Sequence, residues 1–243
     1  NEALRPFLIE TLEGLLDECP SEQGRERLAG LLRDAPPADP GQRASVVRAY
    51  ATTLHAAAPD EGAEGLLAGL AGDSAPVVRL AAELARDRLQ RTPASEDALE
   101  ARLASALSAD EADVRGLACR ELRAVLRETT GDLASGATSD ASRWQARFRL
   151  LVDALARPSV RREAAHAVAD VAARAGTAAA TAADAMLARA DDPDPAVRAA
   201  VLRFIGSARL SGKAGLLAER LASPNDEEAA AAEAALRALG PAA

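Results

Sequence analysis

Residues 191–206 read DDPDPAVRAAVLRFIG, a turn rich in Asp and Pro followed by a Val-Arg pair and regularly spaced apolar residues. Pro is tolerated in the first turn of a helix, and an Asp side chain there accepts hydrogen bonds from backbone N–H groups that the helix leaves free. The stretch therefore predicts a turn and then an amphipathic helix, because its apolar residues recur at spacings of three and four. These residues are Val197, Ala200, Val201, Phe204 and Ile205.

The same phrase recurs at four other places, which indicates an internal repeat. In each copy Asp or Pro precedes a Val-Arg pair, and successive arginines are 31, 36, 46 and 37 residues apart. A sixth, degenerate copy begins at Pro224, where Glu228-Ala229 stands in place of Val-Arg. Repetition at this interval is typical of an array of similar structural units. The five arginines are Arg48, Arg79, Arg115, Arg161 and Arg198.

Amphipathic segments lie between these phrases, so each repeat is expected to be two antiparallel helices. They occupy residues 61–70, 97–107, 143–155 and 214–221. Trp144 opens an apolar stripe in the third of them and is expected to be buried. The composition agrees with an all-α fold, since 63 of the 243 residues are Ala and only 2% are aromatic, whereas strands favour β-branched and aromatic residues.

With these features the chain resembles the HEAT-repeat α-solenoids, which are armadillo-type helical repeats, over roughly residues 39–240. The resemblance implies a right-handed α-solenoid of about six helical hairpins. It also implies that the arginine of each Val-Arg pair bonds to turn carboxylates of its own or a neighbouring repeat, so the five arginines above are expected to be structural. Ser159 replaces the acidic residue in the fourth copy, and the series of carboxylates is expected to be interrupted there.

One array is expected over the whole chain. It divides into an atypical N-terminal cap at residues 1–35, with an extra helix at about 2–18, the repeats at 36–222 and a degenerate C-terminal cap at 223–243. The long step contains an insertion at 129–142, rich in Thr, Ser, Gly and Asp, which predicts an exposed loop. Acidic residues are expected to make the final helix polar on one side, as a terminal repeat requires. They are Asp226, Glu227, Glu228 and Glu233.

Residues that carry enzyme chemistry are scarce in this sequence. His55 and His166 are the only histidines, each is followed by Ala, and no Cys-x-x-Cys or His-x-x-x-His spacing occurs. We therefore expect no catalytic residues, no cofactor and no metal. Cys19 and Cys119 are isolated thiols, which favours a reducing compartment.

The net charge of −8, from 37 acidic residues against 28 Arg and the single Lys213, disfavours general binding to phosphate backbones. No apolar run approaches the roughly 18 residues of a membrane helix, and no signal peptide opens the chain. We expect no membrane partner and a cytoplasmic location. Because the first residue is Asn1 rather than Met, the chain is expected to be trimmed or part of a longer protein.

The second helices line the concave side of such solenoids, so their equivalent positions predict the binding surface. Five residues beyond each Val-Arg arginine stand Thr53, Leu84, Arg120, His166 and Arg203, and the row is basic in three successive repeats. Positions one, five and eight beyond the arginine share one side of a helix, which adds two further arginines. The candidate partner-binding residues are Arg120, Arg123, Arg162, His166 and Arg203.

Three functions are compatible with these residues. The first is a non-enzymatic scaffold or adaptor that binds another protein along the concave face, through an acidic segment of that protein. The alternative is a nucleic-acid-associated adaptor that uses Arg120, Arg162 and Arg203. The resemblance to HEAT-repeat proteins adds a third, an accessory or lyase-type protein, since bilin-attachment proteins use similar repeats.

The charges of the candidate row have two opposing interpretations. Arg120 and Arg203 have no acidic residue three or four positions away in their own helices, so their charges are expected to be available. The opposing interpretation is that these arginines pair with carboxylates of adjacent repeats. If His166 titrates near its ordinary pKa of about 6.5, partner binding is expected to weaken as the pH rises.

Overall fold

The computed structural model describes residues 22–55, 61–90, 92–128 and 139–240. Twelve α-helices and two short 3₁₀ segments occupy these residues, and none of the described residues forms a strand. The prediction of an all-α fold is therefore confirmed. The chain divides into two compact units, Asn1–Leu117 and Ala118–Ala243.

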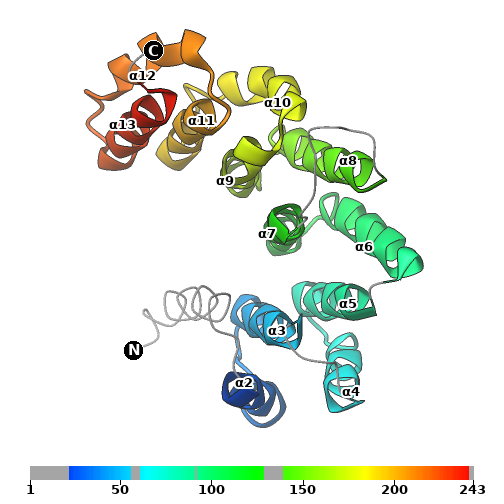
Figure 1. The fold of residues 1–243 in the computed structure, drawn as a ribbon. Helices are drawn as coiled ribbons and strands as arrows, with labels where there is room; N and C mark the ends of the chain where they lie inside the picture. Colours follow the sequence, from blue (N-terminus) through cyan, green and yellow to red (C-terminus); the bar gives the residue numbers. More distant parts are fainter. Residues whose placement is uncertain (1–21, 56–60, 91, 129–138, 241–243) are drawn as a thin grey trace. The chain divides into compact units, whose positions relative to one another are not determined.

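In the first unit, helices that begin at the repeated turns alternate along the chain with the helices that lie between these turns. Helices α3 and α5, which begin at the repeated turns and are called second helices below, pack on each other (Figure 1). Helix α2 contacts α3 and α4, and α5 contacts α4 and α6. The helices are α2 (Glu22–Asp34), α3 (Pro40–His55), α4 (Glu61–Leu70), α5 (Pro76–Gln90), α6 (Pro93–Ala106) and the first residues of α7 (Ala112–Glu128). Buried Val47, Leu54, Leu67, Val78 and Leu84 form part of its core.

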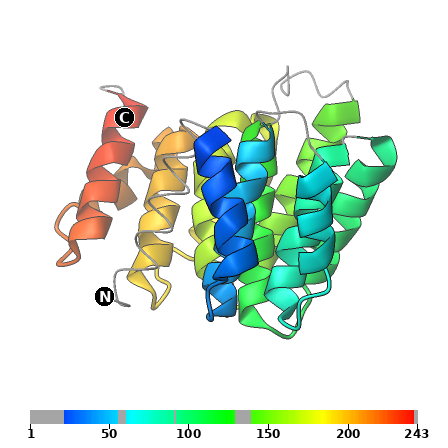
Figure 2. The ribbon, with the colours of Figure 1, turned by 90° about the horizontal axis from the view of Figure 1, so that it is seen from below.

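The second unit repeats this alternation. Helix α9 packs on α11 and α11 on α13, so the second helices follow one another in a row, while α8 contacts α9 and α10, and α12 contacts α13. Helices α11 and α13 lie side by side in both ribbon views (Figures 1 and 2). Besides the rest of α7, the helices are α8 (Ser139–Ala154), α9 (Arg161–Val171), α10 (Thr177–Leu187), α11 (Pro195–Ser207), α12 (Ala214–Arg220) and α13 (Asp226–Leu239).

Small residues set how closely the last two second helices approach. A Cβ atom added to Gly206 of α11 would lie 2.7 Å from the Cα atom of Ala235 in α13, closer than any real Cβ contact. Glycine at this position therefore lets the two backbones pack against each other. The high alanine content serves the same packing, since Ala231, Ala232 and Ala235 are the buried apolar residues of α13.

Trp144 is buried in the core of the second unit, as predicted, with only 2% of its surface exposed. Its ring stacks on Phe148 at a centroid distance of 5.2 Å and an interplanar angle of 17°. The indole N–H donates to the backbone carbonyl of Leu126 at 3.1 Å, which satisfies the polar atom of the buried ring and ties α8 to α7.

The turn residues start the helices as the sequence predicts. Asp39 accepts a hydrogen bond from the N–H of Gln42 at 2.7 Å, and Asp194 accepts one from Ala196 at 3.0 Å. Asn225 does the same for α13. Helix α9 differs, because its first position follows Val160 and no side chain caps it.

The predicted loop at 129–142 is shorter at its C-terminal end than expected. Helix α8 begins at Ser139, so residues 139–142 belong to a helix and not to the predicted loop. The rest of that predicted loop, residues 129–138, and the predicted helix at 2–18 lie outside the described residues.

Candidate partner-binding site

The repeat arginines bind the turn that precedes their own helix. In three copies a guanidinium nitrogen donates to the carbonyl oxygens five and six residues earlier, which fastens the turn to the first part of the helix. The acceptors are Asp73 and Ser74 for Arg79, Ala109 and Asp110 for Arg115, and Asp192 and Pro193 for Arg198. Arg161 reaches the equivalent carbonyl of Leu155 through its Nε atom, at 2.9 Å.

In the first copy Arg43, five residues before the expected Arg48, makes these bonds. Arg43 Nη1 donates to the carbonyls of Pro37 at 2.6 Å and Ala38 at 3.5 Å, again six and five residues earlier. The step from Arg43 to Arg79 is then 36 residues, equal to the next step. The arginine that binds the turn in the first copy is therefore Arg43, because the bonds depend on the distance from the turn and not on a preceding valine. The structural role expected of Arg48 stays a prediction.

This correction moves the first member of the candidate row. Arg48 lies five positions beyond Arg43 and therefore takes the place in the row that was expected for Thr53. Thr53 is buried and its hydroxyl donates to the carbonyl of Tyr50 at 2.7 Å, so it lies inside its hairpin. A proline three residues before the arginine is the sequence signal that these copies share, since it precedes Arg43, Arg79, Arg161 and Arg198 alike.

Two aspartates join one repeat to the previous one. Asp73 accepts the N–H of Ala75 at 2.8 Å and pairs with Arg43 of the preceding repeat at 3.2 Å. The hydrogen bond from Ala75, and then the bond and charge of Arg43, lower the pKa of the Asp73 carboxyl below its usual value. Asp192 repeats the arrangement with the N–H of Asp194 and with Arg161, at 3.0 Å in each case.

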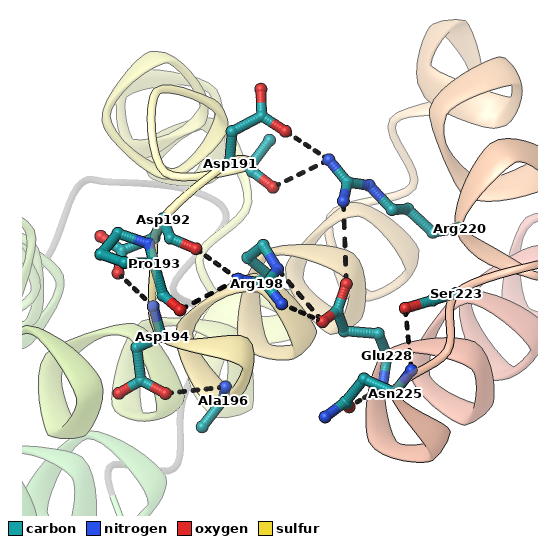
Figure 3. Close-up of polar contacts among 11 residues, drawn as sticks. Asp191, Asp192, Pro193, Asp194, Ala196, Arg198, Arg220, Ser223, Asn225 and Glu228 are labelled. Carbon is teal, nitrogen blue, oxygen red and sulfur yellow. Dashed lines mark hydrogen bonds and ion pairs between the residues drawn. The ribbon is translucent and has the colours of Figure 1, made fainter.

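In the last repeat a buried glutamate replaces the turn aspartate (Figure 3). Glu228 is 1% exposed; one carboxylate oxygen accepts two bonds from Arg198, the longer of them 3.1 Å, and the other lies 3.8 Å from Arg220. Arg220 also bonds to Asp191 and to the carbonyl of Ala190. The expectation that Glu228 lies on the polar outer side of the final helix is wrong, because it stands at the buried position that valine holds in other copies.

The five candidate residues all lie in the second unit, and the structure brings several of them together. Arg203 Nη2 lies 3.0 Å from Nδ1 of His166, across the contact between α11 and α9. Arg123 pairs at 3.3 Å with Asp170, which stands one helical turn beyond His166. We call the residues Arg120, Arg123, Arg162, His166 and Arg203 the second-helix strip.

Three of the strip's arginines, Arg123, Arg162 and Arg203, pair with carboxylates from neighbouring segments. Arg162 pairs with Asp194 at 2.6 Å, and Arg203 pairs with Glu227 at 3.3 Å. The expectation that Arg203 is available is therefore wrong, because its partner comes from the following second helix and not from its own. The pairs nevertheless face solvent, since the Arg162 side chain is 60% exposed and that of Glu227 is 50% exposed.

His166 is neutral at pH 7 in this surrounding. Burial lowers the pKa of its imidazole below 6.5, and the positive charge of Arg203 lowers it further, against the opposing effects of Glu227 and Asp170. Because a guanidinium only donates, Nδ1 of His166 has to accept the hydrogen bond from Arg203, so the proton of the neutral ring is on Nε2. The expected titration near 6.5 is thus corrected to a lower pH, and His166 adds no charge to the strip at neutrality.

We predict that His166 makes the protein less stable in mild acid. Its pKa is lower in the folded state than in the unfolded state, so the unfolded chain binds protons more readily and stability falls as the pH drops below about 6.5. Urea unfolding at pH 7.5, 6.5 and 5.5, followed by Trp144 fluorescence, measures this loss. His166→Asn keeps a hydrogen-bond acceptor for Arg203 without titrating, so its stability is expected to depend less on pH; equal slopes would refute the prediction.

The described residues hold few groups suited to covalent or metal chemistry. Within 22–55, 61–90, 92–128 and 139–240, no three or more His, Cys, Asp or Glu side chains gather where a metal ion would fit. Cys119 is fully buried, and burial, followed by the charge of Glu163, raises the pKa of its thiol to about 12. A thiol that stays protonated is a poor nucleophile.

An open hollow of about 240 Å³ lies beside the strip, between the beginnings of α9 and α11. Its charged lining has both signs, because Arg161 and Arg162 face Asp192 and Asp194 across it. A hollow of this size and openness offers shallow polar contacts and does not enclose a substrate.

No protein-family model matches the chain, and no curated protein matches it. In the part of the chain that the structure describes, no helix has the length and apolar character that crossing a bilayer requires. The function therefore has to be inferred from the geometry of the site.

Proposed function

We propose that the chain is a HEAT-like α-solenoid of about six hairpins that acts as a non-enzymatic adaptor, binding another protein along its second helices. Support comes from the recurring arginine-to-turn bonds and from the packing of second helix on second helix in each unit. Arrays of this kind display equivalent side chains of successive repeats on one extended surface.

The observation that carries the proposal is the second-helix strip. Arg162, Arg203 and Arg123 come from three second helices, and each lies in an ion pair that is partly exposed to water. Exposed pairs of this type contribute little to folding stability, typically about 0–1 kcal/mol, so stability alone does not account for three of them in one row. A partner that offers its own polar groups is able to exchange with them.

The same pairs favour a protein over a nucleic acid as the partner. Asp170, Asp194 and Glu227 each pair with one of these arginines, and each opposes an approaching phosphate. A phosphate backbone carries a charge at every nucleotide, whereas a protein places its charges singly and is able to match a surface of mixed sign. The net charge of −8 acts in the same direction.

A capture experiment with the full chain tests the proposal. The variant Arg120→Glu, Arg162→Glu, Arg203→Glu is expected to lose proteins that the unchanged chain retains from nuclease-treated extract of its native cell. A control with the same charge change, Arg27→Glu, Arg33→Glu, Arg149→Glu, alters exposed arginines outside the strip and is expected to retain them. Circular dichroism checks that both variants keep their helices, and the milder Arg→Gln set replaces the first if it does not.

Equal recovery by the strip variant and the unchanged chain would refute the proposed function.

The salt dependence of binding separates a protein partner from a nucleic-acid partner. A steep fall of affinity with salt indicates counterions released from a nucleic acid, whereas a shallow dependence is expected for a protein partner.

A further inference from the structure

The ion pair between Arg203 and Glu227 is longer than the pair between Arg162 and Asp194. Its Nη1 and Nη2 atoms lie 3.3 and 3.4 Å from the same oxygen of Glu227, whereas Arg162 Nε lies 2.6 Å from Asp194. Charge-assisted N–H···O bonds are typically about 2.7–2.9 Å long. Glu227 therefore pairs with Arg203 without forming a short hydrogen bond.

Glu227 also has a favourable place without Arg203. It stands in the first turn of α13, where the positive end of the helix dipole favours a carboxylate, and its side chain is 50% exposed to water. Swinging away from Arg203 leaves Glu227 hydrated at the helix N-terminus and buries no unpaired charge. Replacing Glu227 with another carboxylate at Arg203 therefore has a small free-energy cost.

His166 keeps the Arg203 guanidinium in place when one carboxylate replaces another. Its Nδ1 atom accepts from Nη2 of Arg203 at 3.0 Å, and the ring is neutral, so it orients Arg203 without neutralising its charge. A guanidinium has five N–H donors in a planar fork that matches a carboxylate. With one donor turned to His166, the rest remain for a ligand.

We infer that Arg203, oriented by His166, is the position where the partner's acidic segment places a carboxylate, and that Glu227 occupies it until the partner arrives. The inference rests on the proposed function and deepens it by naming the partner's chemistry, an Asp- or Glu-containing stretch of polypeptide. Glu227 acts in this arrangement as an internal competitor. Glu227 competes with weakly binding anions for Arg203 and lowers the apparent affinity of the strip for the acidic segment.

Fluorescence anisotropy of labelled octaglutamate, titrated with the full chain in 50 mM salt at pH 7.5, tests this inference. Glu227→Gln removes the competitor, and the affinity is expected to rise about two- to five-fold, the range that loss of one exposed ion pair allows. Glu233→Gln is the matched control, since Glu233 also lies on α13 and pairs with Arg237, yet it removes no competitor from Arg203. Adding Arg203→Gln to Glu227→Gln is expected to cancel the gain.

Equal gains with Glu227→Gln and Glu233→Gln would overturn the inference, because net charge alone would explain them. It is also overturned if Glu227→Gln favours labelled octathymidylate more than octaglutamate. If octaglutamate binds neither chain while the strip variant still loses its captured proteins, the inference fails and the proposed function stands. Retention of all captured proteins by the strip variant would instead refute the proposed function itself.

Discussion

Replacing Glu228 with Ala is expected to lower the free energy of unfolding by about 2–4 kcal/mol. The carboxylate is 1% exposed and is shared by Arg198 and Arg220, so its loss removes the buried counter-charge of Arg198 and leaves Arg220 with Asp191 as its remaining ion-pair partner. The expected loss of stability lies toward the lower end of the range for broken buried ion pairs, because the side chains of Arg198 and Arg220 are 22% and 26% exposed. Urea unfolding of the full chain, followed by circular dichroism, measures it.

Glu233→Ala is the matched control for this effect. Glu233 lies on the same helix and also pairs with an arginine, Arg237, but its side chain is 54% exposed. Exposed pairs four residues apart on a helix contribute about 0.3–0.5 kcal/mol, so the control is expected to change stability by no more than that. Similar losses for the two variants would contradict the role assigned to Glu228.

Replacing Trp144 with Ala is expected to cost about 3–5 kcal/mol, the range for removing a large buried aromatic side chain. The side chain is 2% exposed, stacks on Phe148 and bonds to the carbonyl of Leu126. Alanine leaves a cavity between α7 and α8 and an unsatisfied carbonyl. Thermal melting followed at 222 nm measures the loss.

Trp144→Phe separates the two contributions. Phenylalanine retains most of the stacking on Phe148 but lacks the N–H group that bonds to Leu126. Its cost is expected to be about 1–2 kcal/mol, the value of a buried hydrogen bond plus a small loss of packing. If the alanine variant costs less than the phenylalanine variant, Trp144 does not have the packing role that its burial indicates.

The helices were predictable because their signals are local. Turn residues such as Asp194, together with apolar residues three and four apart, specify where a helix begins and which side is buried. The error in the first copy has the same origin. Val47-Arg48 repeats the dipeptide but lies five residues too far from the turn, and the arginine has to reach carbonyls five and six residues back, as Arg43 does.

The pairing of the candidate site was less predictable because it depends on neighbouring repeats. Sequence spacing placed His166 and Arg203 in one row, and they lie 3.0 Å apart. The carboxylates that meet the arginines come from other helices, 24 residues away for Glu227 and 32 for Asp194. Their contacts depend on how each helix is rotated against the next, which no local pattern specifies.

The aspartates at positions 73 and 192 each belong to two repeats at once. Asp73 shapes its own turn through Ala75 and receives Arg43 from the repeat before. Unfolding of either repeat therefore removes a bond from the other, and we expect this coupling between neighbours to make adjacent repeats fold cooperatively. Position 109 holds Ala in place of this Asp, so amide exchange is expected to find a cooperative block that ends there, with hairpins before it opening together.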